Sequence, residues 1–352
     1  MNSPPIDFIK TMRRDLEGLP GHPEWLRVLT PSQCREWQMP HNFKLVGDYH
    51  ITRGGVTVIG GPPGIGKSRA ALNLALCGTD GSDWLGLPVH QRFKTFVLQN
   101  ENGPHRLKAD FSHLNNVKGL DDSIRITPPP EYGLRFDEPD FRHAFSQELE
   151  EFRPELVVLD PWTNVTRDCT QGDYSDALNH IKSCMPKGDM APAIVIVAHT
   201  RKPRTGSEKP SGVSLLNELM GSTKLGSMAR SAFVMQSASD ETTDNRVIWT
   251  CCKNNDGEKG PRSAWERENG NFIHCHGFDW EGYDKGQKQK TVTKKLMEDL
   301  MKNGRMVSRS YLVDEIMEKA GCGKSTAYAA TTSDGKFSAN LRESDGLLSW
   351  VK

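Results

Sequence analysis

The chain has 352 residues, with 45 lysines and arginines against 45 aspartates and glutamates. Its mean hydropathy is −0.59, and no apolar run reaches the roughly 18 residues that a membrane helix needs. The eight cysteines show no CxxC spacing and are too sparse for a disulfide scaffold, which predicts a cytoplasmic protein. Composition therefore excludes membrane-spanning, collagen-like, disordered and disulfide-stapled classes.

Residues 1–30 contain four prolines and one short amphipathic stretch, and we interpret them as an N-terminal arm. From there to residue 283, short β-rich apolar runs alternate with longer helical or polar stretches. The runs are Val56–Ile59, Thr95–Leu98, Leu156–Leu159, Ile194–Ala198, Ala232–Met235, Val247–Cys252 and Phe272–Cys275. Runs of this length with long connections are typical of a parallel sheet covered on both faces. Residues 31–283 are thus predicted to form one α/β domain.

A phosphate-binding motif follows the first apolar run. Residues 61–68 match GxxxxGK[ST] in full, between a β-branched run and the helix-forming stretch 69–76. Glycines let backbone N–H groups wrap phosphates, and the helix N-terminus adds positive potential. Lys67 is expected to reach the β- and γ-phosphates of ATP, and the Ser68 hydroxyl to bind Mg²⁺. The predicted ATP-binding residues are Gly61, Pro62, Pro63, Gly64, Ile65, Gly66, Lys67, Ser68 and Arg69.

Three later runs lead to polar side chains at the ends of predicted strands. Asp160 is a candidate Mg²⁺ ligand opposite the phosphate loop. Glu101 is a candidate general base for the attacking water, and its alternative is a solvated loop acid. His199 lies where a side chain would sense the γ-phosphate, although a lone histidine at a strand end is more often structural. The carboxyl ends of parallel strands meet at one edge of a sheet, so these three side chains are expected to lie together.

Basic residues after the third of these runs suggest further contacts. Arg230 and Lys253 act either in their own subunit or on the nucleotide of a neighbouring subunit, and the residue pattern is compatible with both. The Pro- and Gly-containing stretch after His199 carries Arg201, Lys202 and Arg204. A charge run of this kind is compatible with a solvated basic loop.

The C-terminal part is a second unit. Residues 284–291 are polar and basic and are predicted to be a linker. In residues 292–352 the pattern predicts a helix up to Leu300, a helix capped by Ser308, a turn, a short third helix and a final strand. This order resembles a winged helix-turn-helix domain, which either binds DNA or docks protein. Its candidate nucleic-acid contacts are Lys324, Ser325 and Tyr328.

Between about residues 50 and 280, these motifs in this order resemble RecA-fold ATPases, within them the plasmid RepA-type hexameric replicative helicases and related RecA-like phage and plasmid ATPases. The resemblance is strongest at 60–68, at 101–107, and at 199–203 with the later Gly221-Ser222. It implies a RecA-like P-loop ATPase fold. It further implies that Glu101 activates water, that Asp160 holds Mg²⁺ and that His199 couples nucleotide state to DNA contact. In that family the loop after His199 faces the central channel of the ring, so the resemblance makes four basic residues candidates for nucleic-acid phosphate contacts: Arg201, Lys202, Arg204 and Lys209. The alternative is a solvated basic loop.

The same resemblance implies that Arg230 serves the ATP of the adjacent subunit and that Lys253, on a late hairpin, also reaches across. DnaB-type helicases carry K-x-R at that hairpin, whereas Lys253-Asn254-Asn255 has no arginine. Arg230 or Arg262 would therefore supply the arginine finger.

Two functions follow from these expectations. The first is an ATP-hydrolysing, ring-forming DNA motor that uses Mg-ATP, acts on single-stranded DNA and assembles as a homo-oligomer, expected to be a hexamer. The alternative is a non-motor ATP-dependent switch or assembly factor that docks DNA or protein through the C-terminal unit. A simple kinase is a weaker third hypothesis, because no second acceptor-binding motif is present.

The neutral total charge conceals a split between the two units. From Lys285 onward there are 13 lysines and arginines and 8 aspartates and glutamates, so 13 − 8 = +5. The remainder carries 45 − 13 = 32 basic and 45 − 8 = 37 acidic residues, a net of −5. An acidic body joined to a basic C-terminal unit favours contact between that unit and a phosphate backbone.

Overall fold

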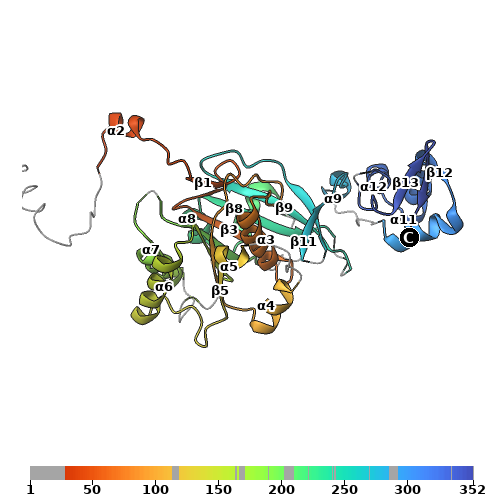
Figure 1. Cartoon of the computed structure of the whole chain (residues 1–352). Coiled ribbons are helices and arrows are strands. Elements are labelled where there is room, and N and C mark those ends of the chain that lie inside the picture. The colour runs from red at the N-terminus through yellow and green to blue at the C-terminus, as the bar shows by residue number, and fades with distance from the viewer. Residues whose placement is uncertain are drawn as a thin grey trace, which may run out of the picture. The chain divides into compact units, whose positions relative to one another are not determined.

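The structure is a computed structural model of the chain, shown in Figure 1. The described residues are 28–112, 119–162, 165, 171–188, 190–201, 210–220, 222–239, 241, 243–268, 270–284, 292–333 and 335–351. Two compact units divide the chain, Met1–Pro40 and His41–Lys352. In the first unit, helix α2 (Pro31–Glu36) begins after Thr30, whose hydroxyl accepts a hydrogen bond from the backbone of Gln33. The greater part of the predicted arm lies outside the described residues.

A nine-stranded sheet forms the centre of the unit His41–Lys352. The strands in spatial order are β11 (Asn271–His274), β10 (Ser263–Glu268), β9 (Arg246–Asn254), β8 (Ser231–Ser237), β3 (Val56–Gly61), β7 (Ala193–His199), β6 (Leu156–Asp160), β4 (Thr95–Gln99) and β5 (Ile124–Thr127). The strands from β8 to β5 are parallel to one another, and β9, β10 and β11 extend the sheet by antiparallel pairing. The predicted α/β fold with a mostly parallel sheet is confirmed.

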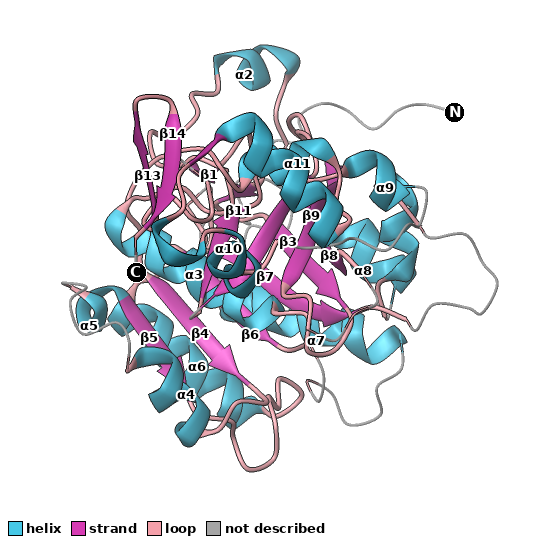
Figure 2. Cartoon of the chain, turned by 90° about the vertical axis from the view of Figure 1, so that its right-hand side faces the viewer, coloured by secondary structure: helices cyan, strands magenta, loops and turns pink. Residues whose placement is uncertain are grey.

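Helices cover both faces of this sheet (Figure 2). Alternate strand residues point to opposite faces, so Val56 and Val58 join one hydrophobic cluster while Ile59 joins the other. Helices α6 and α7 contribute to the first cluster, and α3 contributes to the second. The helices of this part are α3 (Lys67–Asp80), α4 (Pro104–Phe111), α5 (Leu120–Ser123), α6 (Pro139–Phe152), α7 (Gln171–Cys184), the 3-10 helix η1 (Gly212–Glu218), α8 (Ser222–Met228) and α9 (Trp280–Asp284). Both faces of the sheet thus belong to the core, as the apolar runs predict.

All seven predicted strands are present. Six of them extend by one or two residues at one or both ends, and the seventh, β11, lies one residue earlier than predicted, at Asn271–His274. The strands that apolar runs do not reveal are short or half-exposed. Strand β5 alternates polar and apolar side chains, and β10 carries charged residues along its outer part. A two-stranded sheet of β1 (Lys44–Val46) and β2 (Ile51–Thr52) precedes β3. Among the described residues, no helix has the length and apolar character to cross a membrane.

The C-terminal residues build a separate hydrophobic cluster around Leu312, Ile316 and Leu348. Their elements are α10 (Lys294–Leu300), the 3-10 helix η2 (Lys302–Gly304), β12 (Val307–Ser308), α11 (Arg309–Ala320), α12 (Lys324–Ala329), β13 (Leu341–Ser344) and β14 (Leu347–Trp350). The three strands form one sheet in the order β12-β14-β13. The three predicted helices, the Ser308 cap and the last strand are confirmed. The winged-helix interpretation and the domain bounds stay predictions.

Candidate nucleotide site

The phosphate loop lies between the end of β3 at Gly61 and the start of α3 at Lys67. Gly64 and Gly66 have φ angles of +73° and +104°, a region that side chains other than glycine rarely adopt. The loop therefore depends on glycine at these two positions. The loop ends at the N-terminus of α3. The first backbone N–H groups of a helix have no partner within the helix and are suited to binding a phosphate.

Lys67 projects from this helix N-terminus into a buried position and is 6% exposed. Its Nζ donates to the Pro62 carbonyl at 2.9 Å and lies 3.3 Å from His199 Nδ1. Burial lowers the pKa of Lys67 to about 8, against the opposing effects of Asp160 and Glu101. Burial and the Lys67 charge also lower the pKa of His199, so its ring is neutral near pH 7. Nδ1 then accepts a hydrogen bond from the Lys67 ammonium group.

Ser68 and Asp160 together provide oxygen ligands of the kind that Mg²⁺ prefers. The Ser68 hydroxyl donates to Asp160 Oδ1 at 2.9 Å, which brings the predicted metal ligands together. Asp160 is the last residue of β6 and is 2% exposed. Burial raises the pKa of its carboxyl to about 6 despite the hydrogen bonds from Ser68 and Gln99. A divalent cation at this position would offset the cost of burying that charge.

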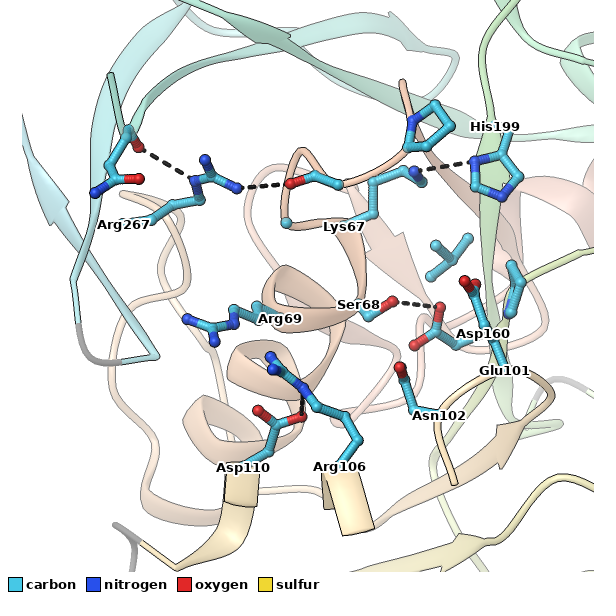
Figure 3. Close-up of a pocket in the computed structure, with 16 residues that line it drawn as sticks. Lys67, Ser68, Arg69, Glu101, Asn102, Arg106, Asp110, Asp160, His199 and Arg267 are labelled. Atoms are coloured by element: carbon cyan, nitrogen blue, oxygen red, sulfur yellow. Dashed lines mark hydrogen bonds and ion pairs between the residues drawn. The ribbon is translucent and has the colours of Figure 1, made fainter. Parts of the chain in front are cut away.

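Glu101 lies two residues beyond the end of β4 and lines the same cavity of about 620 Å³. Figure 3 shows Glu101 and Asp160 side by side, with Lys67 and His199 across the cavity. The negative charge of Glu101 acts to raise the pKa values of Lys67, Asp160 and His199. The structure thus brings Lys67, Ser68, Glu101, Asp160 and His199 to one edge of the sheet, where four parallel strands end.

His199 also begins a hairpin that leads to the predicted nucleic-acid loop. The hairpin stem is held by Met220 N donating to His199 O at 2.8 Å and by Arg201 N donating to Glu218 O at 2.7 Å. Thr200 N donates to Gly61 O at 3.1 Å, which joins the stem to the phosphate loop. Arg201 is exposed at the start of this loop. Lys202, Arg204 and Lys209 lie outside the described residues.

Arg230 and Lys253 do not reach this cavity. The Arg230 backbone N donates to Val56 O at the first residue of β3, about 17 Å along the strand from Gly61. Lys253 lies beside it, since Ala232 of β8 pairs with Lys253 of β9. The Arg230 side chain pairs with Asp256 at 3.6 Å, and Lys253 Nζ donates to the Gly226 carbonyl at 2.9 Å. Both residues therefore lie at the edge of the sheet opposite their own phosphate loop.

The other predicted residues are dispersed. Arg262, the alternative finger, donates two hydrogen bonds to Asp284 at 2.8 and 2.7 Å. Lys324 opens α12 and is exposed, and Tyr328 on the same helix is 49% exposed. Ser325 belongs to α12, and its side chain is not among those described. Arg69 lines the nucleotide cavity, as expected from its position.

Three residues in or beside the cavity have no role assigned from the sequence. Arg267 of β10 donates from Nη1 to the Gly64 carbonyl at 2.8 Å and from Nε to Asn245 O at 3.2 Å. Arg106 of α4 pairs with Asp110 at 3.0 Å on the rim of the cavity. Gln99, the last residue of β4, donates to Asp160. A polar residue at a strand end was a usable signal for Gln99, whereas nothing local links Arg267 to a loop two hundred residues earlier.

No curated protein matches the sequence. Among solved structures, the RadB recombinase aligns with a TM-score of 0.44 and 13% identity, over 63% of this chain and 91% of that chain. A KaiC-like protein from Pyrococcus horikoshii OT3 aligns with a TM-score of 0.44 and 12% identity, over 64% of this chain and 94% of that chain. The sheet order and the phosphate loop are those of a RecA-like P-loop core, as predicted. A family model described as AAA domain matches residues 23–205, more than half of the 352 residues, and the chain therefore belongs to the AAA domain family.

Proposed function

We propose that the protein hydrolyses Mg-ATP and works as a ring-forming motor on single-stranded DNA. The observation that carries the ATPase part is the group of Lys67, Ser68, Glu101, Asp160 and His199 around one cavity at the carboxyl edge of the sheet. This group combines a phosphate cradle, oxygen ligands for a divalent cation and a carboxylate base. Those are the parts that phosphoryl transfer to water requires.

Each side chain has a defined task in this reaction. Lys67 leaves the Pro62 carbonyl and places its charge on the β- and γ-phosphates. Glu101 accepts the proton of the attacking water, because it is the exposed carboxylate on the cavity wall. Ser68 and Asp160 would hold Mg²⁺, which would offset the charge that develops on the phosphate oxygens. His199 loses its lysine partner when Lys67 moves, and it is free to contact the γ-phosphate instead.

The placement of Arg230 and Lys253 supports assembly. Both are basic, both lie at the edge opposite their own phosphate loop, and the Arg230 side chain is 58% exposed. In a head-to-tail arrangement this edge meets the phosphate-loop edge of the next subunit. Arg230 would then act as an arginine finger in trans.

The C-terminal unit supports a DNA contact. Its element order of helix, strand, two helices and two strands is the order expected of a winged helix. The Arg309 guanidinium lies 5.9 Å from the centre of the Tyr328 ring on α12, the helix that the exposed Lys324 opens. We expect Lys324→Ala to lower DNA affinity and to reduce its salt dependence. The matched control is Lys319→Ala on α11, which removes the same charge from the neighbouring helix. Equal losses in both variants would contradict a contact at α12.

The deciding experiment measures ATP hydrolysis with Mg²⁺, with and without single-stranded DNA, beside the oligomer mass by mass photometry. We expect stimulation by DNA, oligomers of about six subunits by family resemblance, and at least a 100-fold loss of turnover in Lys67→Ala, in line with about 3 kcal/mol for a key charge contact. DNA-stimulated turnover that survives Lys67→Ala would overturn the proposal.

A fork-unwinding assay separates the motor from the switch. Unwinding with ATP and Mg²⁺ supports the motor. Strong ATP hydrolysis and ATP-dependent assembly without unwinding support the alternative, a switch or assembly factor that docks DNA or protein through the C-terminal unit.

A further inference from the structure

We propose that Gln99 is a positioning residue that holds the carboxylate of Asp160 and the turn carrying Glu101 in one fixed arrangement. The inference rests on the proposed function, since it concerns the same cavity. Gln99 does not line that cavity itself. It would act through its two neighbours.

The fold places Gln99 beside Asp160. Strands β4 and β6 are adjacent and parallel, and Gln99 pairs in register with Asp160 as the last residue of its strand. Gln99 is 3% exposed. A polar side chain buried to this degree is costly unless its donors and acceptors are satisfied, and both ends of this amide have partners.

The two ends of the amide serve different partners. Nε2 donates to Asp160 Oδ2 at 3.2 Å, while Ser68 occupies Oδ1. Oε1 accepts from the backbone N–H groups of three consecutive residues at 3.2 to 3.3 Å, namely Asn100, Glu101 and Asn102. One side chain therefore ties a buried carboxylate to the backbone of the turn that presents the candidate base.

Only an amide of this length satisfies both ends. A carboxylate at position 99 has no proton for Asp160 when ionised, and a hydrocarbon leaves the three N–H groups without this acceptor. A flipped amide would set its NH₂ against three donors and its oxygen against a carboxylate. The orientation of the Gln99 amide is thus determined by its partners, and with it the relation between Asp160 and Glu101.

Gln99→Glu tests this directly because it keeps the shape and the acceptor while removing the donor. We expect ATP turnover at pH 8 to fall about 10- to 100-fold, as for other groups that orient a metal ligand. Because the lost contact holds a candidate metal ligand, the loss should appear in kcat and in a higher Mg²⁺ concentration for half-maximal turnover.

Two further variants separate positioning from general stability. Gln99→Met removes donor and acceptor together, so its loss of turnover should be at least as large as that of Gln99→Glu. Thr127→Val is the matched control, because the Thr127 hydroxyl accepts from the Gln99 backbone N–H at 3.2 Å and leaves the amide untouched. We expect it to keep wild-type turnover and the wild-type Mg²⁺ requirement. A loss in Gln99→Glu that parallels its thermal unfolding midpoint and leaves the Mg²⁺ requirement unchanged would overturn the proposal.

A binding measurement distinguishes failure of the positioning role of Gln99 from failure of the proposed ATPase function. A fluorescent ATP analogue is titrated with and without Mg²⁺ at pH 8. We expect Gln99→Glu to weaken binding with Mg²⁺ about tenfold or more and to leave binding without Mg²⁺ close to wild type. A wild-type protein without ATP turnover overturns the proposed function only. Mg²⁺-dependent binding equal to wild type in Gln99→Glu overturns the role of Gln99.

Discussion

At the scale of single residues, sequence reasoning located the side chains whose type and local spacing carry a motif. Lys67 and Ser68 follow from the glycine pattern, and Asp160, Glu101 and His199 follow from their places after apolar runs. Gln99 and Arg267 did not emerge, because Asp160, the partner of Gln99, comes from another strand, and Gly64, the partner of Arg267, comes from the distant phosphate loop. A hydrogen bond across a sheet depends on strand order, which a linear pattern does not contain.

The pKa values of two residues predict the pH dependence of ATP turnover. Asp160 must be ionised to hold a metal, and its pKa of about 6 means that it is protonated below that pH. Lys67 must be charged to hold phosphate, and its pKa of about 8 means that it loses its proton above that pH. We expect kcat/KM, which reports the free enzyme, to fall about tenfold per pH unit below 6 and above 8. A flat profile between pH 5 and 9 would contradict this, provided that the Mg²⁺ concentration stays below saturation, because bound Mg²⁺ competes with the proton on Asp160.

Arg267 predicts an effect on nucleotide affinity. Its guanidinium holds the Gly64 carbonyl and so keeps the phosphate loop in shape before the nucleotide arrives. Arg267→Ala should raise KM for ATP about 3- to 10-fold, equivalent to roughly 1 kcal/mol for one such hydrogen bond, and should change kcat less. Steady-state kinetics decide this. Arg267→Lys keeps the charge without the paired donors, so an intermediate KM is expected, and an unchanged KM in both variants would refute the role.

At the scale of elements, the buried strands were predictable and the antiparallel extension was not. Strands such as β6 and β7 are buried along their length and read as continuous apolar runs. In strand β10, which carries Arg267, three charged residues in a row follow the two buried ones. Its sequence therefore resembles a surface segment. The contact between β3 and the hairpin after His199 could not be predicted from the sequence either, because it depends on the lack of a side chain at Gly60.

Gly60 and Leu219 predict a coupled pair. A Cβ on Gly60 would lie 2.2 Å from Leu219 Cδ2, and Leu219 is fully buried. We expect Gly60→Ala to lower the free energy of unfolding by about 1 to 3 kcal/mol through overpacking. Leu219→Ala should cost about 2 to 5 kcal/mol through the cavity that it leaves.

In the double variant, the free energy of unfolding should exceed the value expected from adding the two single effects by about 1 kcal/mol or more. The smaller side chain at position 219 leaves room for the Cβ at position 60, and that Cβ partly fills the cavity. Urea unfolding measures all three. Gly103→Ala is the control for a methyl group added without a clash, since a Cβ there meets nothing within 4 Å. Gly103 is the N-cap of α4, where alanine is less favourable than glycine, so its effect should stay within about 1 kcal/mol. Strict additivity of the pair would contradict the packing argument.

At the scale of the whole molecule, the residues argued to complete one active site lie at two edges of one sheet. Lys67 lies at the carboxyl end of β3, and Arg230 lies beside its amino end. Sequence spacing left open whether Arg230 acts within its own subunit, because strand direction and order had to be known first. The strand order and register place Arg230 away from its own phosphate loop, which is why we propose that it acts in trans.

A mixing experiment tests that action in trans. Lys67→Ala and Arg230→Ala subunits should each be inactive alone. In an equal random mixture, an intact phosphate loop meets an intact Arg230 at about one interface in four, so about one quarter of the wild-type rate should return. Mixing Lys67→Ala with the double variant gives no such interface and serves as the control. Mixed oligomers without recovered turnover would count against Arg230 as the finger.

The opposite placement of these residues gives the proposed assembly a direction. Every subunit offers one edge that receives a finger and one edge that supplies it, so contacts between subunits are heterologous. An open filament keeps one unmatched edge at each end, whereas a closed ring keeps none. Specific turnover should then drop on dilution below the concentration at which subunits associate, because a lone subunit holds only half of a working site.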